Sequence, residues 1–375
     1  MKVLAVVGTR PEAIKMAPVI FELRRKVQTL VCITGQHRDM LTQALGVFAI
    51  SPDIVLESMS PGQSLNMLAS RLLAGMDNVL DKEHPDWVLA QGDTTSAFCA
   101  SLAAFQKQIR VGHVEAGLRT GDLRSPFPEE GNRNLIARIA SVHFAPTRAA
   151  RDALLREGIS ESNITITGNT IVDSIELIRA EWQRGVRPEV PENILRLIET
   201  KPIILVTCHR RENFGKVLEG ICDMLKSLAA RYPDFQWIFP VHLNPNVRGP
   251  VHQILDGVAN ISLIEPVDYR TSLYLISRST LIISDSGGIQ EEAPSFAVPV
   301  VVMRELTERL EGVKAGFATL AGQSPAAIEK AATVWLDEGA RQADLKDRPN
   351  PYGDGRASQR IVARLLGQLV EEFHG

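Results

Sequence analysis

Short apolar runs alternate along the chain with longer segments in which apolar residues recur about every 3.6 positions. In the first half, strand-like runs lie at 2–8, 30–34, 86–93, 109–117, 142–147 and 164–169. Segments 11–26, 37–48 and 95–107 have helical spacing. Continuous Val, Ile and Leu runs between helices are typical of a parallel sheet that is buried on both faces.

The same alternation restarts in the second half. A segment rich in Pro, Arg and Glu at 182–200 indicates a connection, and strand-like runs follow at 203–209, 235–242, 261–266, 281–285 and 299–303. We therefore predict an α/β protein with two doubly wound, Rossmann-like domains, at 1–169 and 170–356. In such folds ligands bind at the carboxyl ends of the strands, and with two domains the cleft between them is the expected active site.

Composition narrows the functional class. The 375 residues fit two domains, and 45% hydrophobic and 23% charged residues are ordinary for a soluble enzyme. A net charge of −3 gives no overall field for nucleic acid or an anionic membrane, so any anion site must be local. No apolar stretch approaches the roughly 20 residues that span a bilayer, and the N-terminal run is too short for a signal peptide.

The cysteines are scattered and form neither a CxxC pair nor a zinc spacing. They are Cys32, Cys99, Cys208 and Cys222. Single cysteines of this kind are typical of buried thiols in a reducing cytosol, so we expect a cytoplasmic protein.

Basic residues follow the first predicted strand. Gly8 permits close backbone approach, and Arg10 and Lys15 flank the start of the next helix, which together indicate an anion site. The alternative is that both cations are simply solvated. No G-x-G-x-x-G fingerprint follows this strand, so a nicotinamide cofactor is not indicated, and we predict no cofactor.

Carboxylates follow later strands of the same sheet. Asp93, Glu115 and Glu129 are expected on one side of it, and the apolar neighbours of Glu115 should raise its pKa. Carboxyl groups in unlike environments that converge on one cleft are suited to acid–base chemistry. The alternative is that Asp93 and Glu129 only cap the helices that follow them.

Histidines stand beside two predicted strand ends. The H-x-E at 113–115 imitates the zinc motif of deaminases, but the P-C-x-x-C that must follow is absent, so we predict no metal and a structural His113. His209, Arg210 and Arg211 end the first strand of the second half, where they meet a ligand or form a surface loop paired with Glu212.

The stretch DSGGIQEEAP at 285–294 reads as strand end, turn and helix. Gly287 and Gly288 let the backbone approach a phosphate or diphosphate, Ser286 can donate to it, and Glu292 suits sugar hydroxyls. The D-S-G-G also occurs around the nucleophile of chymotrypsin-like proteases. That interpretation is rejected, because those proteases are antiparallel barrels and this chain alternates strands and helices.

The polar motifs, taken together, resemble the non-hydrolysing UDP-N-acetylglucosamine 2-epimerase family of bacteria. The matching segments, in order from residue 1 to about 357, are GTRPEAIKMAPVI, TGQHRDML, QGDTTSA, GHVEAGLRTGD, SPFPEEGNR, ITGNT, HRRENFG, PVHLNPNV, DSGGIQEEAP, TERL and NPYGDG. The resemblance implies a GT-B architecture, in which the C-terminal helix, expected at 357–375, packs back on the first domain.

The resemblance also implies the reaction. UDP-GlcNAc and UDP-ManNAc would be interconverted by elimination of UDP to 2-acetamidoglucal and re-addition, which supplies ManNAc units for surface polysaccharide. The implied catalytic residues are Asp93, Glu115, Glu129 and His209. The implied substrate-binding residues are Arg10, Lys15, Ser286, Gly287, Gly288, Glu292 and Arg309. A second UDP-GlcNAc, as allosteric activator, would bind Gln36, His37, Arg210 and His242, and a homodimer is implied.

The chain departs from the family pattern at three positions. Leu310 replaces a proline after Arg309, Ser272 replaces a phenylalanine near the uracil, and Gly62 replaces an arginine at the regulatory site. Two other functions remain open from the residues alone. One is a GT-B glycosyltransferase that uses the same UDP-sugar cleft, and the other is a non-catalytic UDP-sugar sensor.

Overall fold

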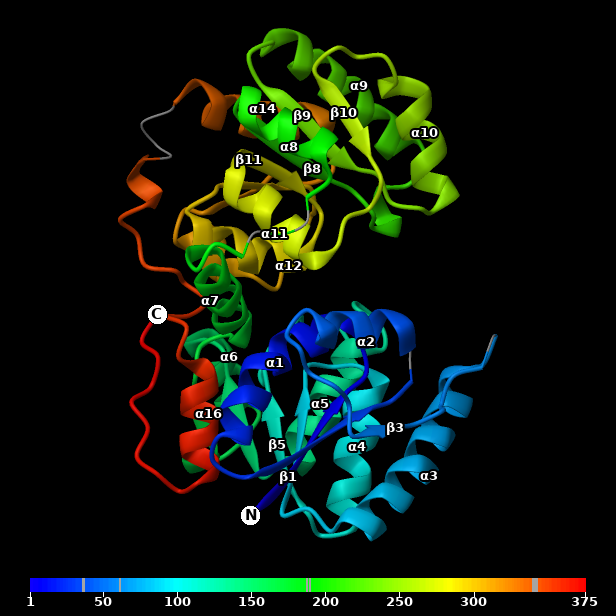
Figure 1. The fold of residues 1–375 in the computed structure, drawn as a ribbon, viewed down its shortest axis with the longest axis vertical. Coiled ribbons are helices and arrows are strands. Elements are labelled where there is room, and N and C mark those ends of the chain that lie inside the picture. Colours follow the sequence, from blue (N-terminus) through cyan, green and yellow to red (C-terminus); the bar gives the residue numbers. More distant parts are fainter. Residues whose placement is uncertain (36–37, 61, 187, 189, 339–342) are drawn as a thin grey trace. The chain divides into compact units, whose positions relative to one another are not determined.

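The computed structural model describes residues 1–35, 38–60, 62–186, 188, 190–338 and 343–375, and it divides the chain into two compact units (Figure 1). Unit 1 comprises Met1–Leu177 and Tyr352–Gly375, and unit 2 comprises Ile178–Pro351. The division falls inside one helix, eight residues after the boundary expected from the sequence. None of the described helices is long and apolar enough to cross a membrane.

Unit 1 is built on a seven-stranded parallel sheet. Its strands lie in the order β3 (Ile54–Val55), β2 (Gln28–Ile33), β1 (Lys2–Val7), β4 (Trp87–Gln91), β5 (Arg110–Val114), β6 (Val142–Ala145) and β7 (Ile164–Ile166). Its helices are α1 (Arg10–Arg24), α2 (Arg38–Gly46), α3 (Leu65–Glu83), α4 (Thr95–Gln106), α5 (Glu129–Ile139), α6 (Arg148–Arg156), the first part of α7 (Thr170–Gln183), and α16 (Ala357–Leu365). The central strands are buried along nearly their whole length, as expected for a sheet covered on both faces.

Unit 2 repeats this plan with six parallel strands. They lie in the order β10 (Ile261–Ile264), β9 (Gln236–Pro240), β8 (Ile203–Thr207), β11 (Ser279–Ser284), β12 (Val300–Val302) and β13 (Ala318–Leu320). Its further helices are α8 (Glu192–Thr200), α9 (Lys216–Arg231), α10 (Pro245–Leu255), α11 (Tyr269–Arg278), α12 (Gly287–Glu292), α13 (Leu310–Lys314) and α14 (Pro325–Asp337).

Both sheets change winding direction at one place. In unit 1 the order turns between β1 and β4, and in unit 2 it turns between β8 and β11. At such a point the loops that leave neighbouring strands diverge to opposite faces and open a crevice beyond the strand ends. The residues that follow these four strands are therefore the ones that the fold places at its two ligand-binding edges.

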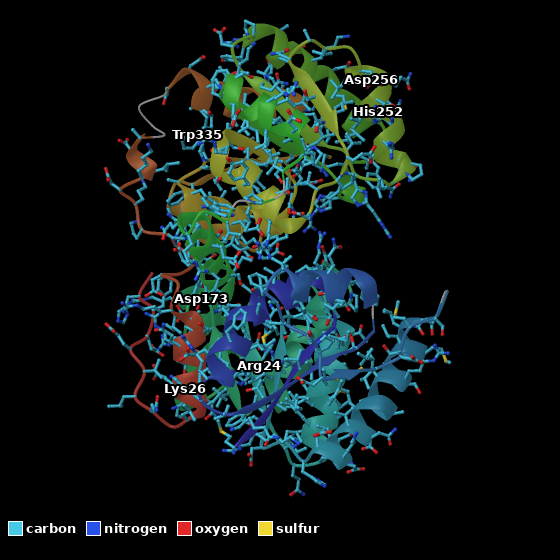
Figure 2. All side chains as sticks on the ribbon, in the orientation of Figure 1. Arg24, Lys26, Asp173, His252, Asp256 and Trp335 are labelled. Atoms are coloured by element: carbon cyan, nitrogen blue, oxygen red, sulfur yellow. The ribbon has the colours of Figure 1, made fainter. Side chains whose placement is uncertain are left out.

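The C-terminal segment belongs to unit 1. Helix α16 packs against α1, and its first turn is fixed by buried Asp173, which accepts hydrogen bonds from Ala357 N at 3.1 Å and Ser358 N at 2.8 Å (Figure 2). The helix ends at Leu365, whereas the sequence predicted helix over 357–375. The reason is Gly367, whose φ of +70° ends the helix, and the remaining residues continue without regular structure.

Candidate active site

The loop after β1 is fixed tightly against the loop after β4. Gly8 has no room for a side chain, because a Cβ there would lie 2.4 Å from the Cβ of Ser96. Thr9 and Glu12 form a capping box at the start of α1, so this turn follows directly from the sequence T-R-P-E. Arg10, the first residue of α1, is exposed.

Glu12 joins these two loops from inside. Its carboxylate accepts hydrogen bonds from Gly8 N at 2.5 Å, Thr9 N at 2.9 Å and Thr94 Oγ1 at 2.5 Å, and the side chain is buried. Burial raises the pKa of Glu12 to about 7, although the hydrogen bonds from Thr94 and the two backbone N–H groups oppose the shift. Glu12 therefore titrates near neutral pH, directly behind the predicted anion site.

Replacing Glu12 with glutamine should flatten the pH dependence of stability. A carboxyl group whose pKa is higher in the folded protein than in the unfolded chain stabilises the fold most below its unfolded pKa of 4.5. This contribution to the free energy of unfolding is lost as the pH rises to about 7. The loss corresponds to about 3 kcal/mol. Urea unfolding at pH 5 and pH 8 should therefore show a fall in wild-type stability that is smaller in Glu12→Gln, and equal falls would contradict the prediction. Burial lowers the pKa of His113 to about 4 and that of His143 to about 3. Both histidines are present in the wild type and in Glu12→Gln, so their effect on the pH dependence cancels when the two proteins are compared.

Lys15 and Glu115 form a buried ion pair. Their side chains are 8% and 9% exposed, and Asn169 Nδ2 donates to the same Glu115 oxygen at 3.2 Å. Glu115 follows β5 with φ of +63°, a left-handed conformation that turns its side chain away from the strand direction. The sequence predicted Lys15 at the substrate and Glu115 among apolar neighbours. In the structure each has the other as a partner.

Asp93 is held by residues of α5. Arg133 approaches one of its carboxylate oxygens with Nε at 2.7 Å and NH2 at 2.5 Å, and Asn132 Nδ2 donates to the Asp93 carbonyl at 2.8 Å. The helix cap of α4 is Thr94, whose Oγ1 accepts from Ala97 N at 3.1 Å. Capping therefore does not explain Asp93, and its carboxylate remains a candidate for chemistry.

Glu129 and Glu130 have different surroundings in the first turn of α5. Glu129 is half-buried, and Pro128 rather than Glu129 is the N-cap residue. Glu130 is buried, accepts hydrogen bonds from Thr120 N and Gly121 N at 3.1 Å each, and pairs with Arg133. Glu130 thus ties the loop after β5 to the helix that holds Asp93.

His113 has a structural contact. Its Nε2 lies 2.7 Å from the Gly92 carbonyl oxygen inside the sheet. Among the described residues, no group of three or more His, Cys, Asp or Glu side chains is placed to hold a metal ion.

In unit 2, Asp285 organises the loop that follows β8. It is fully buried, and its Oδ2 accepts hydrogen bonds from His209 N at 2.9 Å, Arg210 N at 2.8 Å and Asn213 Nδ2 at 2.9 Å. Its Oδ1 lies 3.1 Å from His209 Nδ1. Burial by itself would raise the pKa of Asp285, but the His209 imidazole and the two backbone N–H groups lower it to about 2.

The turn after β11 has the expected form. Ser286 is the N-cap of α12, and its Oγ accepts from Ile289 N. Gly287 is buried, and a Cβ there would lie 2.9 Å from the guanidinium carbon of Arg309, whereas Gly288 is exposed. The arginine predicted to bind the substrate therefore lies directly against this turn.

Two carboxylates hold Arg309 in place. Its Nε donates to Glu291 Oε1 at 2.8 Å, and its NH1 lies 2.6 Å from Glu308 Oε1. Burial would raise the pKa of Glu308, yet the charges of Arg309 and Arg304 lower it to about 2. Glu292 is also buried.

The predicted regulatory residues are only partly described. Gln36 and His37 lie outside the described residues. Arg210 donates from Nε to the Asp285 carbonyl at 3.0 Å, and the His242 ring stacks on the His209 ring with centroids 6.0 Å apart. The structure therefore brings residues predicted for two different sites together at one edge of unit 2.

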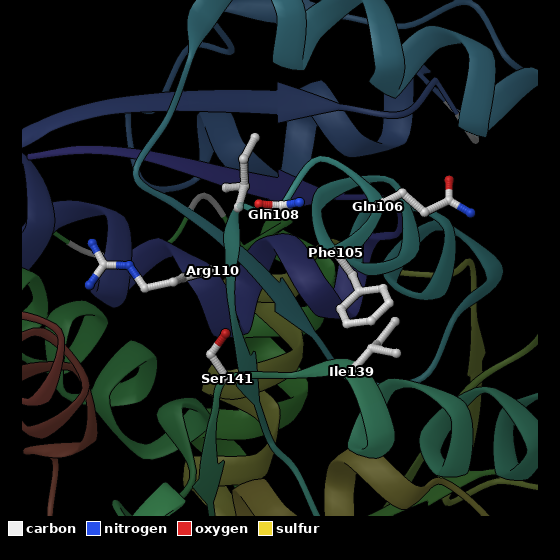
Figure 3. A pocket seen from close by; sticks show the side chains of 7 residues that line it. Phe105, Gln106, Gln108, Arg110, Ile139 and Ser141 are labelled. Atoms are coloured by element: carbon white, nitrogen blue, oxygen red, sulfur yellow. The ribbon is translucent and has the colours of Figure 1, made fainter.

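Two open hollows lie elsewhere on unit 1. One, of about 430 Å³, is lined by Phe105, Arg110, Ile139 and Ser141 at the amino end of β5, opposite to the edge that holds Asp93 (Figure 3). The other, of about 380 Å³, includes Glu130. The first contains none of the predicted site residues.

Sequence reasoning missed the residues that hold the candidate site residues in place. They are Glu12, Glu130, Arg133, Asp285 and Glu291. All five stand in a quoted motif within four residues of a predicted site residue, so a charged residue near a site residue was the available signal. What each one contacts became visible only in the fold.

A family model described as UDP-N-acetylglucosamine 2-epimerase matches residues 21–366. The UDP-N-acetylglucosamine 2-epimerase of Escherichia coli K12 is 49% identical over 375 residues, which cover 99% of this chain and 100% of that protein.

Solved structures give the same result. The Neisseria meningitidis UDP-GlcNAc 2-epimerase bound to UDP-GlcNAc is 44% identical with a TM-score of 0.89, and the match covers 98% of this chain and 100% of that chain. The Methanocaldococcus jannaschii enzyme, in complex with UDP-GlcNAc and UDP, is 33% identical with a TM-score of 0.81 over 98% and 100%. The predicted fold, two Rossmann-like α/β sheets of the GT-B type, is confirmed. The chain belongs to the UDP-N-acetylglucosamine 2-epimerase family.

Proposed function

We propose that this protein interconverts UDP-GlcNAc and UDP-ManNAc by inverting C2 of the sugar. Family membership supports the proposal, as does the Neisseria relative, whose structure holds UDP-GlcNAc. The observation in this chain that carries it is the pair of carboxylates at the carboxyl edge of unit 1. Asp93 and Glu115 are each placed there by a buried cation, Arg133 and Lys15. A glycosyl transfer does not require a proton to move at C2, and so does not require this pair.

The chemistry accounts for these groups. The C2 proton is not next to a carbonyl, so direct deprotonation is very unfavourable. The C1–O bond therefore breaks first, and UDP leaves with the bonding electrons. The C2 proton then passes to a carboxylate, which gives 2-acetamidoglucal. Protonation of C2 from the opposite face and return of the UDP oxygen to C1 complete the inversion, and no oxidant is consumed.

The roles proposed for the residues rest on the family resemblance and are supported by the positions of these residues after the strands. We assign proton movement at C2 and stabilisation of positive charge at C1 to Asp93, Glu115 and Glu129. Lys15 acts through Glu115. In unit 2, His209 assists the leaving diphosphate. The remaining assignments to UDP are Arg10, Ser286, Gly287, Gly288, Arg309 and, for the ribose, Glu292.

The test is isotope exchange in D2O. Incubated with UDP-GlcNAc, the protein should place deuterium at C2 of both epimers, because the abstracted proton is exchanged before it returns. Small amounts of free UDP and 2-acetamidoglucal should also be released. The readouts are the C2 proton signal by NMR and the product masses.

Two outcomes would contradict the proposal. C2 that stays fully protonated, with folded protein that binds UDP-GlcNAc, would exclude epimerisation. Release of UDP only after an acceptor sugar is added would indicate a glycosyltransferase instead.

Three further properties are proposed. A second UDP-GlcNAc as activator is consistent with the basic cluster at Arg210, whose pKa is lowered by burial and by the nearby charge of Arg304.

A homodimer is consistent with Phe105 on α4 and Leu135 on α5, which are each 52% exposed. A cytoplasmic location is consistent with four buried free cysteines.

A further inference from the structure

His209 is an exposed residue with one buried partner. Its side chain is 41% exposed, whereas that of Asp285 is fully buried, and Nδ1 of the ring lies 3.1 Å from Oδ1 of the carboxylate. The two residues follow neighbouring strands, β8 and β11, at the point where the sheet of unit 2 changes direction. The pair therefore lies at an edge where this fold binds ligands.

The carboxylate is fixed independently of the ring. Its other oxygen accepts from two consecutive backbone N–H groups, those of His209 and Arg210, and from the Asn213 side chain. With a pKa of about 2, Asp285 carries its charge throughout the neutral range. The same group thus holds both the backbone and the imidazole of His209.

The ring is also restrained on one face. His242 stacks on it at 6.0 Å between centroids and 24° between planes. Asn244 N donates to His242 Nδ1 at 3.1 Å, which fixes the orientation of that second ring. Rotation of His209 away from Asp285 is therefore opposed by packing as well as by charge.

We propose that Asp285 is a positioning residue for catalysis, which holds His209 as the Nδ1–H tautomer and directs Nε2 toward the diphosphate of the substrate. A carboxylate is an acceptor only, so the ring nitrogen that faces it must carry a hydrogen. Nε2 then lies on the far side of the ring, where it takes up a proton and donates it to the departing oxygen. The negative charge of Asp285 offsets the positive charge that the ring carries in that step.

This inference deepens the proposed function and rests on it, because His209 has a leaving-group role only if UDP departs. The competing interpretation is that Asp285 merely stabilises the turn at 208–213. The two interpretations differ in what the loss of the Asp285 carboxylate does to the His209 ring. A structural role predicts lost stability, whereas a positioning role predicts a changed tautomer and a slower chemical step in a folded protein.

The decisive variant is Asp285→Asn. One amide oxygen can still accept from the backbone of His209 and Arg210, but the NH2 then faces Nδ1 and imposes the Nε2–H tautomer. We expect kcat for epimerisation to fall by roughly 10²–10⁴-fold, with KM for UDP-GlcNAc changed by no more than about 3-fold. In a His209→Gln background the same substitution should cause no further fall in kcat, because Asp285 acts through that ring.

A second readout does not depend on activity. Ring ¹⁵N NMR above pH 8, with the His209 signals assigned by their absence in His209→Gln, should show Nδ1–H in the wild type and Nε2–H in Asp285→Asn. Nε2–H in the wild type, an unchanged tautomer in the variant, or additive losses of kcat would overturn the proposal. If the wild type shows no exchange at C2, the proposed function fails, and the tautomer measurement still decides whether Asp285 holds the ring.

Discussion

Replacing Glu115 with glutamine is expected to lower the epimerisation rate by about 10²–10⁴-fold, because the variant cannot accept or return a proton at C2. Lys15→Met should cause a loss of similar size, since it leaves a buried carboxylate without its cation. The two residues contact each other, so the double variant should be little slower than either single one. The measurements are kcat, KM and the rate of C2 deuterium exchange for all three variants.

The matched control is Lys26→Met, which removes a lysine that pairs with Glu22 at 2.8 Å but is 39% exposed (Figure 2). An exposed pair of this kind contributes at most about 1 kcal/mol, so rate and stability should change little. If Lys15→Met behaved like Lys26→Met, or if the losses from Glu115→Gln and Lys15→Met simply multiplied, the ion pair would not be a functional unit.

The second large effect is on folding. Gly117→Ala should lower the free energy of unfolding of unit 1 by about 3 kcal/mol or more, because left-handed backbone and a steric clash act together. Gly117 has φ of +91°, and a Cβ there would lie 2.2 Å from the carbonyl oxygen of Ala150 in α6. The added Cβ is bonded to the backbone of residue 117, and the oxygen belongs to the backbone of α6. The clash therefore cannot be relieved without displacing β5 or α6. Urea unfolding measures the change, and hydrogen exchange of amides in β5 and α6 assigns it to unit 1.

Gly121→Ala separates the two causes. Gly121 has a similar φ of +82°, but nothing lies within 4 Å of the position that a Cβ would take. Its alanine variant should lose only about 1 kcal/mol, the cost of the backbone conformation alone. Equal losses from Gly117→Ala and Gly121→Ala would show that the contact with Ala150 is not the main cause.

The sequence predicted most strands of both sheets correctly, because each of these strands is a continuous apolar run, but it assigned no helix to α3, which has 19 residues. It missed β3 and β13, which have only two and three residues. Strands this short have no recognisable pattern and form because a neighbouring strand offers hydrogen-bonding groups. The last helix predicted from the sequence continued past Gly367, because apolar residues keep a helical spacing beyond the position where the backbone leaves the helix.

For the site, the sequence could predict which residues lie at strand ends, but not which residues they contact. Asp93, His209 and Ser286 were predicted at strand ends, and they lie there because strand ends follow from the apolar runs. Their partners come from distant segments, Arg133 being 40 residues from Asp93, and Asp285 being 76 residues from His209. Only the order of strands in each sheet determines which loops meet, and a single sequence does not show that order.

The return of the chain to unit 1 after residue 352 has a consequence for protein synthesis. The seven strands of unit 1 leave the ribosome first, but Ala357 and Ser358, which satisfy buried Asp173, are 184 and 185 residues further along. At a usual rate of roughly 5–20 residues per second, they follow about 10–40 s later. Unit 2 meanwhile emerges with all its strands in one stretch. The domain that is translated first is therefore completed last.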